Sequence, residues 1–466
     1  MKHRVHDEDG KIISSYKDPS GYVFFKDGKL FRRVNECYID IYRQARDSGL
    51  FQELIQKKLL IEHEEIEEYA GDDPHLVIRP RMLKFISYPY EWSFSQLKDA
   101  ALVILEIQRI SISYGFTLKD AHAFNIQFDD NLPVMIDTLS FDRWDQTPWE
   151  AYRQFCESFL IPLALMRYRN LYLNTLLKQF LNGIPLEIGS KLLPLRTRLS
   201  IPLLMHIHLH ADRVVAKQKT GVVSSELKPV QKFSEQSMLG LCMSLNRAVR
   251  TLELSKANSI WYTYYHKSCI YSPNAFDIKK QFVAEIIEKQ RPSVIWDLGC
   301  NIGEFSFLAA KYSDLVVAID SDPMCIEGLY QQCKIKKIAN VLPLQMDLIN
   351  PSPPLGWELQ ERLSLFERGG CDLVLALALI HHLCISANVP LEYVARLLGS
   401  LSKQLVIEFV PKEDPQVQVL LSSRKDVFKN YCREAFESAF AEHFGIIRAE
   451  RLPESDRILY HMVRLV

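Results

Sequence analysis

The sequence predicts an α/β protein with two domains, of which the C-terminal one is built on a parallel sheet. Three observations predict this fold class. The length of 466 residues is that of two or three average domains. From residue 293 onward, short apolar runs alternate with helical patterns, as they do in parallel sheets with crossover helices. Residues 1–217 instead mix hairpins, short strands and helical segments, which is typical of an α+β domain.

The composition is that of an ordinary globular protein and excludes several classes of function. Hydrophobic residues make up 48% and the formal net charge is −1, so the chain as a whole does not attract nucleic acid. No apolar run approaches the ~20 residues that a membrane span needs, and no membrane partner is expected. The ten cysteines form no C-x-x-C pair and no signal peptide is visible, so we expect reduced thiols in a cytoplasmic protein.

The N-terminal region begins with a predicted hairpin over residues 21–34, because Asp27-Gly28 is a strong turn dipeptide between two apolar runs. The next predicted elements are a helix over 38–61, a strand over 76–79 and a helix over 94–113. Residues 148–216 are predicted to be helical, in several segments broken by prolines.

A connecting region is predicted over residues 218–256. Residues 219–236 are polar and contain Gly, Ser and Pro, which favours a linker. A helical pattern follows over 237–254. The second domain is therefore predicted to span 257–466.

A second hairpin is predicted between Asn125 and Asp137. The apolar runs on either side of the polar turn are symmetric about Asn131. In a hairpin with that centre, Asn125 and Asp137 lie directly opposite, with their Cα atoms ~5 Å apart. An amide oxygen and a carboxylate in this arrangement are suitable ligands for magnesium.

The strongest signal lies in the C-terminal region, where the apolar run 294–296 leads into Asp297-Leu-Gly-Cys-Asn-Ile-Gly303 and then a helical pattern. A strand that ends in a glycine turn before a helix presents free backbone N–H groups to a cleft. The glycines allow an approach that a Cβ atom would block. Asp320 ends the next apolar run, 23 residues after Asp297, where an acid binds ribose hydroxyls. Together these features predict a nucleoside cofactor.

The D-x-G-x-x-x-G pattern of Asp297, Gly299 and Gly303 resembles motif I of class I S-adenosylmethionine-dependent methyltransferases. The dinucleotide fingerprint is not matched, because Asn301 and Glu304 stand where its second and third glycines belong. Asn301 replaces a glycine of many family members, and Asn tolerates positive φ better than most residues. The resemblance covers about residues 257–466. It implies a Rossmann-like, seven-stranded sheet and S-adenosylmethionine as cofactor.

The predicted strands and acids after this motif come in the same order as in this family. Apolar runs that read as the third, fourth, fifth and last strands lie at 341–347, 372–378, 404–409 and 457–463. The resemblance implies that Asp297 meets the methionine amino group and that Asp347 reaches the adenine amino group. The cofactor-binding residues carried over from the family are Asp297, Gly299, Cys300, Asn301, Gly303, Asp320, Met346, Asp347 and Leu377.

His381 and His382 are the candidate catalytic residues, because they follow the fourth strand, where the family places substrate-facing groups. A histidine titrates near neutral pH and can accept a proton from the acceptor. The alternative is that they only cap the strand end. Glu408, at the end of the fifth strand, is a weaker candidate. The aromatic residues 261–268, Tyr271 and Phe276 form either a lid over the cofactor or plain core.

The acceptor stays open among a small molecule, a peptide and an RNA, because a fold does not determine its substrate. The Asn/Asp-Pro-Pro-aromatic motif is absent after the fourth strand, which counts against methylation of an adenine amino group. The oligomeric state is likewise open. No metal site is predicted, because the histidines at 206, 208 and 210 lack an H-E-x-x-H frame and favour a packed or solvated cluster.

Asp120, Asn125 and Asp137 resemble the catalytic loop and the metal-binding aspartate of protein kinases and aminoglycoside phosphotransferases. The resemblance implies a kinase-like domain over 1–217 with a helical large lobe. It also implies that Asp120 is the base and that the other two residues are metal ligands. The glycine-rich phosphate loop and the V-A-I-K lysine are absent, and Thr138-Leu139 replaces Phe-Gly. Phosphoryl transfer depends on those parts, so we favour a recognition or regulatory module.

The function predicted from the sequence is therefore S-adenosylmethionine-dependent methyl transfer, with the kinase-like domain recognising the substrate or regulating the enzyme. One alternative is an ATP- and magnesium-dependent phosphotransferase, or a bifunctional enzyme, that uses Asp120, Asn125 and Asp137. Another is a non-catalytic scaffold that retains nucleoside binding.

Overall fold

The chain forms two compact units in the computed structural model, which describes residues 11–66, 76–220, 232–254, 271–422 and 426–465. The first unit comprises Met1–Lys256 together with Pro354–Leu363. The second comprises Ala257–Pro353 and Ser364–Val466. The aromatic segment 261–268 lies outside the described residues. Among the helices that the structure describes, none combines the length and the apolar character needed to cross a membrane.

The first unit contains a four-stranded antiparallel sheet in the order β1-β2-β4-β3. Its strands are β1 (Gly21–Lys26), β2 (Lys29–Val34), β3 (His63–Glu65) and β4 (Leu76–Pro80). The predicted first hairpin is confirmed, with both Asp27 and Gly28 at positive φ. The prediction of one helix over 38–61 was wrong. Gly49, at φ 87°, separates α1 (Glu36–Asp47) from α2 (Leu50–Gln56), since that angle interrupts a right-handed helix.

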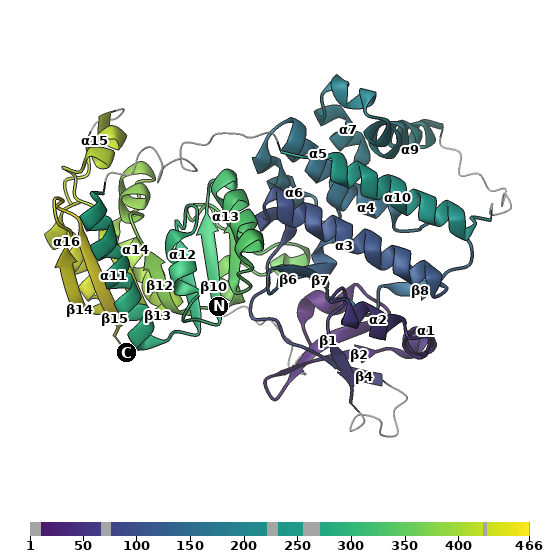
Figure 1. Ribbon diagram of the computed structural model, residues 1–466, viewed down its shortest axis with the longest axis horizontal. Helices are drawn as coiled ribbons and strands as arrows, with labels where there is room; N and C mark the ends of the chain where they lie inside the picture. Colours follow the sequence, from purple (N-terminus) through teal and green to yellow (C-terminus); the bar gives the residue numbers. More distant parts are fainter. Residues whose placement is uncertain (1–10, 67–75, 221–231, 255–270, 423–425, 466) are drawn as a thin grey trace. The chain divides into compact units, whose positions relative to one another are not determined.

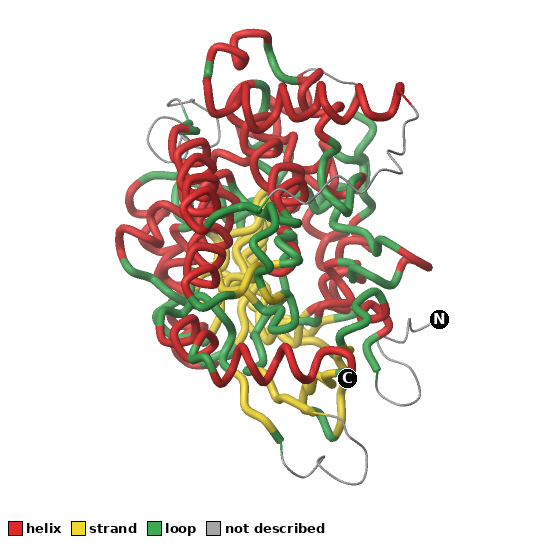
Figure 2. The backbone as a smooth tube through the Cα atoms, turned by 90° about the vertical axis from the view of Figure 1, so that its right-hand side faces the viewer, coloured by secondary structure: helices red, strands yellow, loops and turns green. Residues whose placement is uncertain are grey.

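The rest of the first unit is mainly helical. The long helix α3 (Phe94–Ser113) begins with a capping box between Ser93 and Gln96. Its other α-helices are α4 (Tyr152–Phe155), α5 (Ile161–Tyr168), α6 (Leu176–Gln179), α7 (Leu186–Leu192), α8 (Ile201–Leu203), α9 (Leu209–Thr220) and α10 (Glu235–Thr251). Helix α10 covers the predicted helix 237–254 and packs against α3 within this unit. Helices α7 and α9 lie at the end of the unit opposite the four-stranded sheet (Figures 1 and 2).

The second predicted hairpin forms, but its centre lies half a residue from the predicted position. Strand β6 (Ile126–Asp129) pairs with β7 (Leu132–Met135), and Ile126 faces Met135. Asp130 and Asn131 are both at positive φ, as a two-residue turn between twisted strands requires. The predicted pairing of Asn125 with Asp137 was therefore wrong, because Asn125 faces Ile136, whose N–H donates to its carbonyl at 2.8 Å. Strands β5 (Phe116–Leu118) and β8 (Phe141–Arg143) pair next to this hairpin.

The second unit is built on a seven-stranded sheet in the order β11-β10-β9-β12-β13-β15-β14. The strands are β9 (Val294–Leu298), β10 (Leu315–Asp320), β11 (Val341–Gln345), β12 (Cys371–Ala376), β13 (Ser402–Phe409), β14 (Phe444–Arg451) and β15 (Ile458–Arg464). The pairs among β9 to β13 are parallel, and β15 is antiparallel to both of its neighbours. The predicted strands and the reversed last strand are confirmed. Strand β14 was not predicted.

Helices pack against this sheet, and the side chains buried between the helices and the strands form the hydrophobic core of the second unit. The helices are α11 (Pro273–Gln290), α12 (Glu304–Ala309), α13 (Pro323–Lys336), α14 (Leu391–Leu401), α15 (Pro415–Ser422) and α16 (Arg433–Ala441). Buried residues of α11, α12 and α13 pack on alternate residues of the central strands, such as Val316, Ala318, Leu373 and Leu375. These strands are buried on both faces and read as continuous apolar runs, which is why the sequence locates them well.

Candidate active site

A pocket of about 280 Å³ lies at the carboxyl edge of the central strands. Strand β9 stands between β10 and β12, so the strand order reverses at this point. Such a reversal opens a crevice in which α/β sheets bind ligands. The pocket is lined by Gly299, Asn301, Ile319, Asp320, Ser321, Met346, Asp347, Leu348, Ile349, Leu377, Ala378, Leu379, His381, His382, Leu383, Gln416 and Arg457.

The glycine turn after β9 forms one wall of the pocket. Gly299, Asn301 and Gly303 have φ angles of 76°, 51° and 87°. The N–H groups of Gly299 and Cys300 both donate to the Ile319 carbonyl, at 2.9 and 3.1 Å. These bonds hold the turn against the end of β10. A Cβ atom at Gly303 would lie 2.3 Å from Leu329, so this position also requires glycine for close packing with α13.

Asp320 presents its carboxylate to the pocket from the end of β10. The carboxylate accepts the Asn301 N–H at 2.8 Å and the Asp322 N–H at 2.9 Å. Burial raises the pKa of Asp320 from 3.8 to about 6. Asp347 is exposed at the end of the next strand, and its side chain accepts the Ile349 N–H at 2.9 Å. Both acids thus border the same pocket.

Asp297, Cys300 and Gly303 are not among the described residues that line the pocket. The Asp297 carboxylate is buried and accepts the Ser306 hydroxyl at 2.6 Å, which ties β9 to α12 behind the turn. Burial raises the pKa of Asp297 to about 6. Burial also raises the pKa of the Cys300 thiol well above its ordinary value, so this residue acts through its backbone N–H.

The two candidate catalytic histidines both line the pocket. His381 is buried, and its Nδ1 atom has no hydrogen-bond partner among the described residues. Its ring lies 4.2 Å from that of His382. Burial lowers the pKa of His381 well below its ordinary value, and the pKa of His382 is lowered for the same reason. At neutral pH both rings are therefore uncharged, and an uncharged imidazole can accept a proton.

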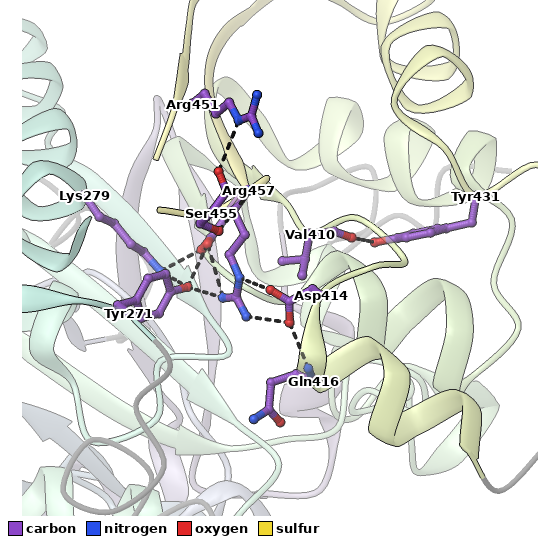
Figure 3. A network of polar contacts seen from close by, with 10 residues as sticks. Tyr271, Lys279, Val410, Asp414, Gln416, Tyr431, Arg451, Ser455 and Arg457 are labelled. Atoms are coloured by element: carbon purple, nitrogen blue, oxygen red, sulfur yellow. Dashed lines mark hydrogen bonds and ion pairs between the residues drawn. The ribbon is translucent and has the colours of Figure 1, made fainter. Parts of the chain in front are cut away.

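Beside the histidines lies a buried network of charged side chains, shown in Figure 3. Lys279 of α11 donates to Glu408 at the end of β13, at 2.7 Å. The Tyr271 hydroxyl donates to Glu408 at 2.7 Å and accepts from Lys279 at 2.9 Å and from Arg457 at 2.5 Å. Arg457 also makes a two-bond ion pair with Asp414, at 2.6 and 3.0 Å. The network has two cations and two carboxylates, so its formal charge is zero.

The network anchors one end of the pocket. Arg457 lines it directly, and the Asp414 carboxylate accepts the N–H of Gln416, which also lines it. Burial raises the pKa of Glu408, but Lys279 and Arg457 outweigh that effect and hold the pKa below its ordinary value. Glu408 therefore stays ionised as a partner of these cations and has no proton to exchange at neutral pH.

In the first unit, Asp120, Asn125 and Asp137 lie around Ser140 and Arg32. Asn125 donates to the Ser140 hydroxyl at 3.4 Å, and that hydroxyl donates to Asp137 at 2.6 Å. Arg32 of β2 forms an ion pair with Asp137 at 2.5 Å. Burial raises the pKa of Asp120, and the charge of Asp137 raises it further. Burial also raises the pKa of Asp137, but the charge of Arg32 and the hydrogen bonds from Ser140 and Leu139 together outweigh burial, and the pKa is lowered.

His206 and His208 of the first unit are packed side chains with hydroxyl partners. His206 contacts the Tyr152 hydroxyl and the Ser244 hydroxyl, each at 2.8 Å. His208 contacts the hydroxyls of Ser190 at 2.8 Å and Thr197 at 2.9 Å. Within the described part of the chain, no three His, Cys, Asp or Glu side chains are grouped so that they can hold a metal ion.

The chain is 33% identical over 465 residues to the nodulation protein NoeA of Rhizobium meliloti, and this similarity covers 98% of the chain and 96% of NoeA. The chain belongs to the NoeA family. No family model matches it. It is also 38% identical over 58 residues, or 12% of its length and 18% of the relative's, to the tRNA (guanine(37)-N(1))-methyltransferase Trm5b of Pyrococcus abyssi.

Two solved structures that resemble this NoeA-family protein each cover less than half of it. The N-methyltransferase NodS of Bradyrhizobium japonicum WM9 is 12% identical, with a TM-score of 0.30, and the match covers 42% of this chain and all of NodS. The magnesium protoporphyrin IX methyltransferase ChlM of Synechocystis PCC 6803 is 18% identical, with a TM-score of 0.32, and the match covers 44% of this chain and 92% of ChlM.

The seven-stranded sheet and the reversed last strand predicted for this NoeA-family protein are confirmed. Methyl transfer from S-adenosylmethionine is what the resemblance of the second unit implies. The strand order with one reversed strand is the one that the resemblance implies. The residues present fit the cofactor, because the turn leaves room where a Gly299 side chain would stand and Asp320 faces the same space.

Sequence reasoning missed three parts of this NoeA-family site, namely Arg457, Gln416 and Lys279. Arg457 and Gln416 line the pocket, and Lys279 holds Glu408. Lys279 lies on α11, Gln416 lies at the start of α15, and Arg457 directly precedes β15. The position of Arg457 as the first residue of the last predicted strand was the one local signal, since a charged residue at the end of a buried strand is expected to have a partner.

In this NoeA-family protein we expect the affinity for S-adenosylhomocysteine to rise about tenfold from pH 5 to pH 7. The Asp320 carboxyl is mostly protonated below its pKa of about 6, and a protonated acid is a poorer acceptor for ribose hydroxyls. In the free protein the same shift lowers the free energy of unfolding as the pH rises from about 4 to about 6, because the folded state binds this proton more tightly than the unfolded chain.

Isothermal titration across this pH range measures the expected change in affinity. Asp320→Asn is the control variant and is expected to flatten the profile, because an amide does not titrate there. An affinity in the unaltered protein that stays constant across the range would contradict the prediction.

Proposed function

We propose that this protein transfers the methyl group of S-adenosylmethionine to a hydroxyl or amine acceptor bound beside His381 and His382. The observation that carries this proposal is the buried His381 ring, which lines the cofactor pocket with Nδ1 unpartnered among the described residues. An uncharged imidazole at this position is ready to accept the proton of the acceptor. The full-length similarity to NoeA, which is named a nodulation protein, supports a part for this reaction in nodulation.

The cofactor, when bound, supplies an electrophilic methyl group on its sulfonium. The protein's own residues then have three tasks. The glycine turn and Asp320 hold the nucleoside end, and Asp297 braces the turn from behind through Ser306. Arg457 and Gln416 line the same pocket and position the acceptor. His381 accepts the acceptor's proton, with His382 packed against it. Alignment of the two reactants accounts for much of the rate in such a displacement.

We further infer that the first unit is a kinase-like recognition or regulatory module rather than an active phosphotransferase. Its order of sheet, long helix, loop with Asp120, hairpin and Asp137 supports the kinase-like interpretation. Arg32 supports the regulatory role, because its guanidinium is bound to Asp137, where a phosphotransferase would bind a metal ion.

The segment 354–363, which belongs to the first unit, supports the same inference. The Arg362 guanidinium lies 4.1 Å from the centre of the Phe124 ring, in the loop between Asp120 and Asn125. The Leu363 N–H donates to the Tyr88 hydroxyl at 2.8 Å. Lys17 forms an ion pair with Glu361, also at 2.8 Å. The chain itself thus occupies the surroundings of the loop in which a phosphotransferase would bind its substrate.

His381→Asn is expected to lower the rate of methyl transfer by about 10²- to 10⁴-fold and to leave the affinity for S-adenosylhomocysteine unchanged, because the substitution removes a proton acceptor. The measurement is the formation of S-adenosylhomocysteine from S-adenosylmethionine with a panel of hydroxyl compounds, amines and RNA. His382→Asn is the matched variant. If both variants keep the full rate, the proposed role of the histidines is wrong.

The variant Asp137→Ala tests the proposal against the phosphotransferase alternative. Methyl transfer and ATP hydrolysis are both measured on the same preparation of each protein. We expect unchanged methyl transfer and no ATP hydrolysis in either form of the protein. ATP hydrolysis in the unaltered protein that requires magnesium and is lost in Asp137→Ala would instead favour a bifunctional enzyme.

A further inference from the structure

An exposed apolar surface lies in the helical part of the first unit. Leu195 and Leu199 are 82% and 86% exposed, and Ile201 is 71% exposed. The exposed apolar residues of this stretch are Leu192, Leu195, Leu199, Ile201, Met205 and Leu209. We call these six residues the apolar ridge. Single exposed aliphatic residues are common, but six within one short stretch are not explained by the packing of the unit.

The apolar ridge is held in place by a well-packed base. Residues 195–199 form a 3-10 turn whose Thr197 is buried, and the Thr197 hydroxyl donates to the Pro194 carbonyl at 2.6 Å and contacts His208 at 2.9 Å. Leu193 and Leu203 are buried on either side. The exposure of Leu195 and Leu199 is therefore a consequence of a defined turn, and their side chains point away from a fixed support.

The helical half of the ridge presents one face to solvent. Ile201, Met205 and Leu209 recur every four residues along α8, the following π-helical turn (Leu204–His208) and the start of α9. Residues at this spacing share a helix face. The opposite face contributes His206, Ile207 and His208, all buried. The segment is thus amphipathic, with its core face already partnered.

Basic residues lie along and close to the stretch that carries the apolar ridge. Arg169 donates to the Leu192 carbonyl at 2.7 Å, and the Arg196 guanidinium lies 5.6 Å from the centre of the Tyr168 ring. The basic residues at or next to the ridge are Arg167, Arg169, Lys191, Arg196, Arg198 and Arg213. The acidic residues between 187 and 213 are Glu187 and Asp212. Six basic residues therefore stand against two acidic ones here, and Arg198 forms an ion pair with Asp212 at 3.8 Å, so the stretch has a net positive charge whereas the whole chain has a formal net charge of −1.

We propose that the apolar ridge and its basic rim bind an anionic lipid surface. Protruding aliphatic side chains enter the boundary between headgroups and acyl chains, while arginine and lysine contact anionic headgroups. The half-exposed Tyr172, near the basic rim, has the amphipathic ring that such a boundary favours. A lipid surface fits better than a protein partner, because the most exposed leucines project from a turn rather than line a groove. Binding at the interface requires no membrane-spanning helix.

The experiment is co-sedimentation of the full chain with phosphatidylcholine vesicles that contain or lack phosphatidylglycerol. We expect binding to the anionic vesicles and weak or no binding to phosphatidylcholine alone. Leu195→Ser/Leu199→Ser is expected to weaken binding by at least about tenfold, because two exposed leucines no longer insert. Arg196→Gln/Arg198→Gln is expected to weaken it by about thirtyfold, at roughly fivefold per charge. Added salt is expected to weaken binding further.

Two matched variants show whether the effect belongs to this surface. Ile335→Ser removes an aliphatic side chain that is 71% exposed, like Ile201, from α13 in the second unit, and Lys334→Gln/Lys336→Gln removes two charges there. Both are expected to bind vesicles like the unaltered chain. Equal binding by all variants, or no binding to anionic vesicles, would overturn the proposal. A concentration-dependent dimer that Leu195→Ser/Leu199→Ser abolishes in sedimentation velocity would overturn it too, because the ridge would then contact a second copy.

Discussion

Gly299→Arg is expected to abolish binding of S-adenosylhomocysteine. Gly299 lines the pocket at φ 76°, and a Cβ atom there would already lie 3.3 Å from Leu379. The rest of an arginine side chain would fill the space of the cofactor. In the unaltered protein, ligand at 100 times its Kd is expected to raise the free energy of unfolding by about 2.7 kcal/mol. A thermal melt with and without the ligand measures this gain, which is expected to vanish in the variant.

The matched control for this substitution is Gly240→Arg. Gly240 lies on the exposed side of α10, where a Cβ atom meets nothing within 4 Å. We expect the ligand-induced shift of this variant to equal that of the unaltered protein. Asp320→Ala removes a pocket group without adding bulk and is expected to reduce the shift in a protein that folds normally. A full shift in Gly299→Arg would mean that the ligand binds elsewhere.

Glu408→Ala is expected to lower the free energy of unfolding of the second unit by about 3–5 kcal/mol, the cost of leaving buried charges without a partner. Glu408 is fully buried, and its carboxylate accepts hydrogen bonds from Lys279 and Tyr271. Removing it leaves the buried Lys279 ammonium without its carboxylate partner, although the Tyr271 hydroxyl can still accept from it. Chemical denaturation measures the loss, followed by fluorescence in a variant that keeps the buried Trp296 as its one tryptophan.

Two further variants test whether the loss of stability in Glu408→Ala comes from the buried network of charged side chains. Glu288→Ala, an exposed acid on α11, is expected to change the free energy of unfolding by at most about 0.5 kcal/mol. Lys279→Met/Glu408→Leu removes both charges and is expected to recover much of the loss, because no unpaired ion is left. A loss in Glu408→Ala no larger than that in Glu288→Ala would contradict the prediction.

The contribution of Glu408 to the free energy of unfolding depends on pH in a definite direction. The pKa of Glu408 is lower in the folded protein than in the unfolded chain, because Lys279 and Arg457 outweigh the effect of burial. Its stabilising contribution is therefore present above the ordinary glutamate pKa of about 4.3 and is lost as the pH falls below that value.

The amino-acid sequence by itself determined the elements whose signals are local. The strands β9 to β13 are buried on both faces and appear as apolar runs, and the turn from Gly299 to Gly303 needs residues that accept positive φ. Asp320 and Asp347 stand where the apolar runs of β10 and β11 end, so their positions could be predicted from the same runs. The candidate cofactor site could be predicted for this reason, because a parallel sheet brings its strand ends to one edge.

Only the tertiary structure decided which distant residues meet. The centre of the second hairpin depends on two residues at positive φ, and Gly49 broke a helix that the apolar pattern alone made continuous. Lys279 and Arg457, 178 positions apart, converge on Glu408, and Arg32 reaches Asp137. Such pairings depend on how α11, β13 and β15, or β2 and the hairpin, pack in space. Spacing along the chain carries no information about them, because a long side chain finds its partner across elements rather than within one.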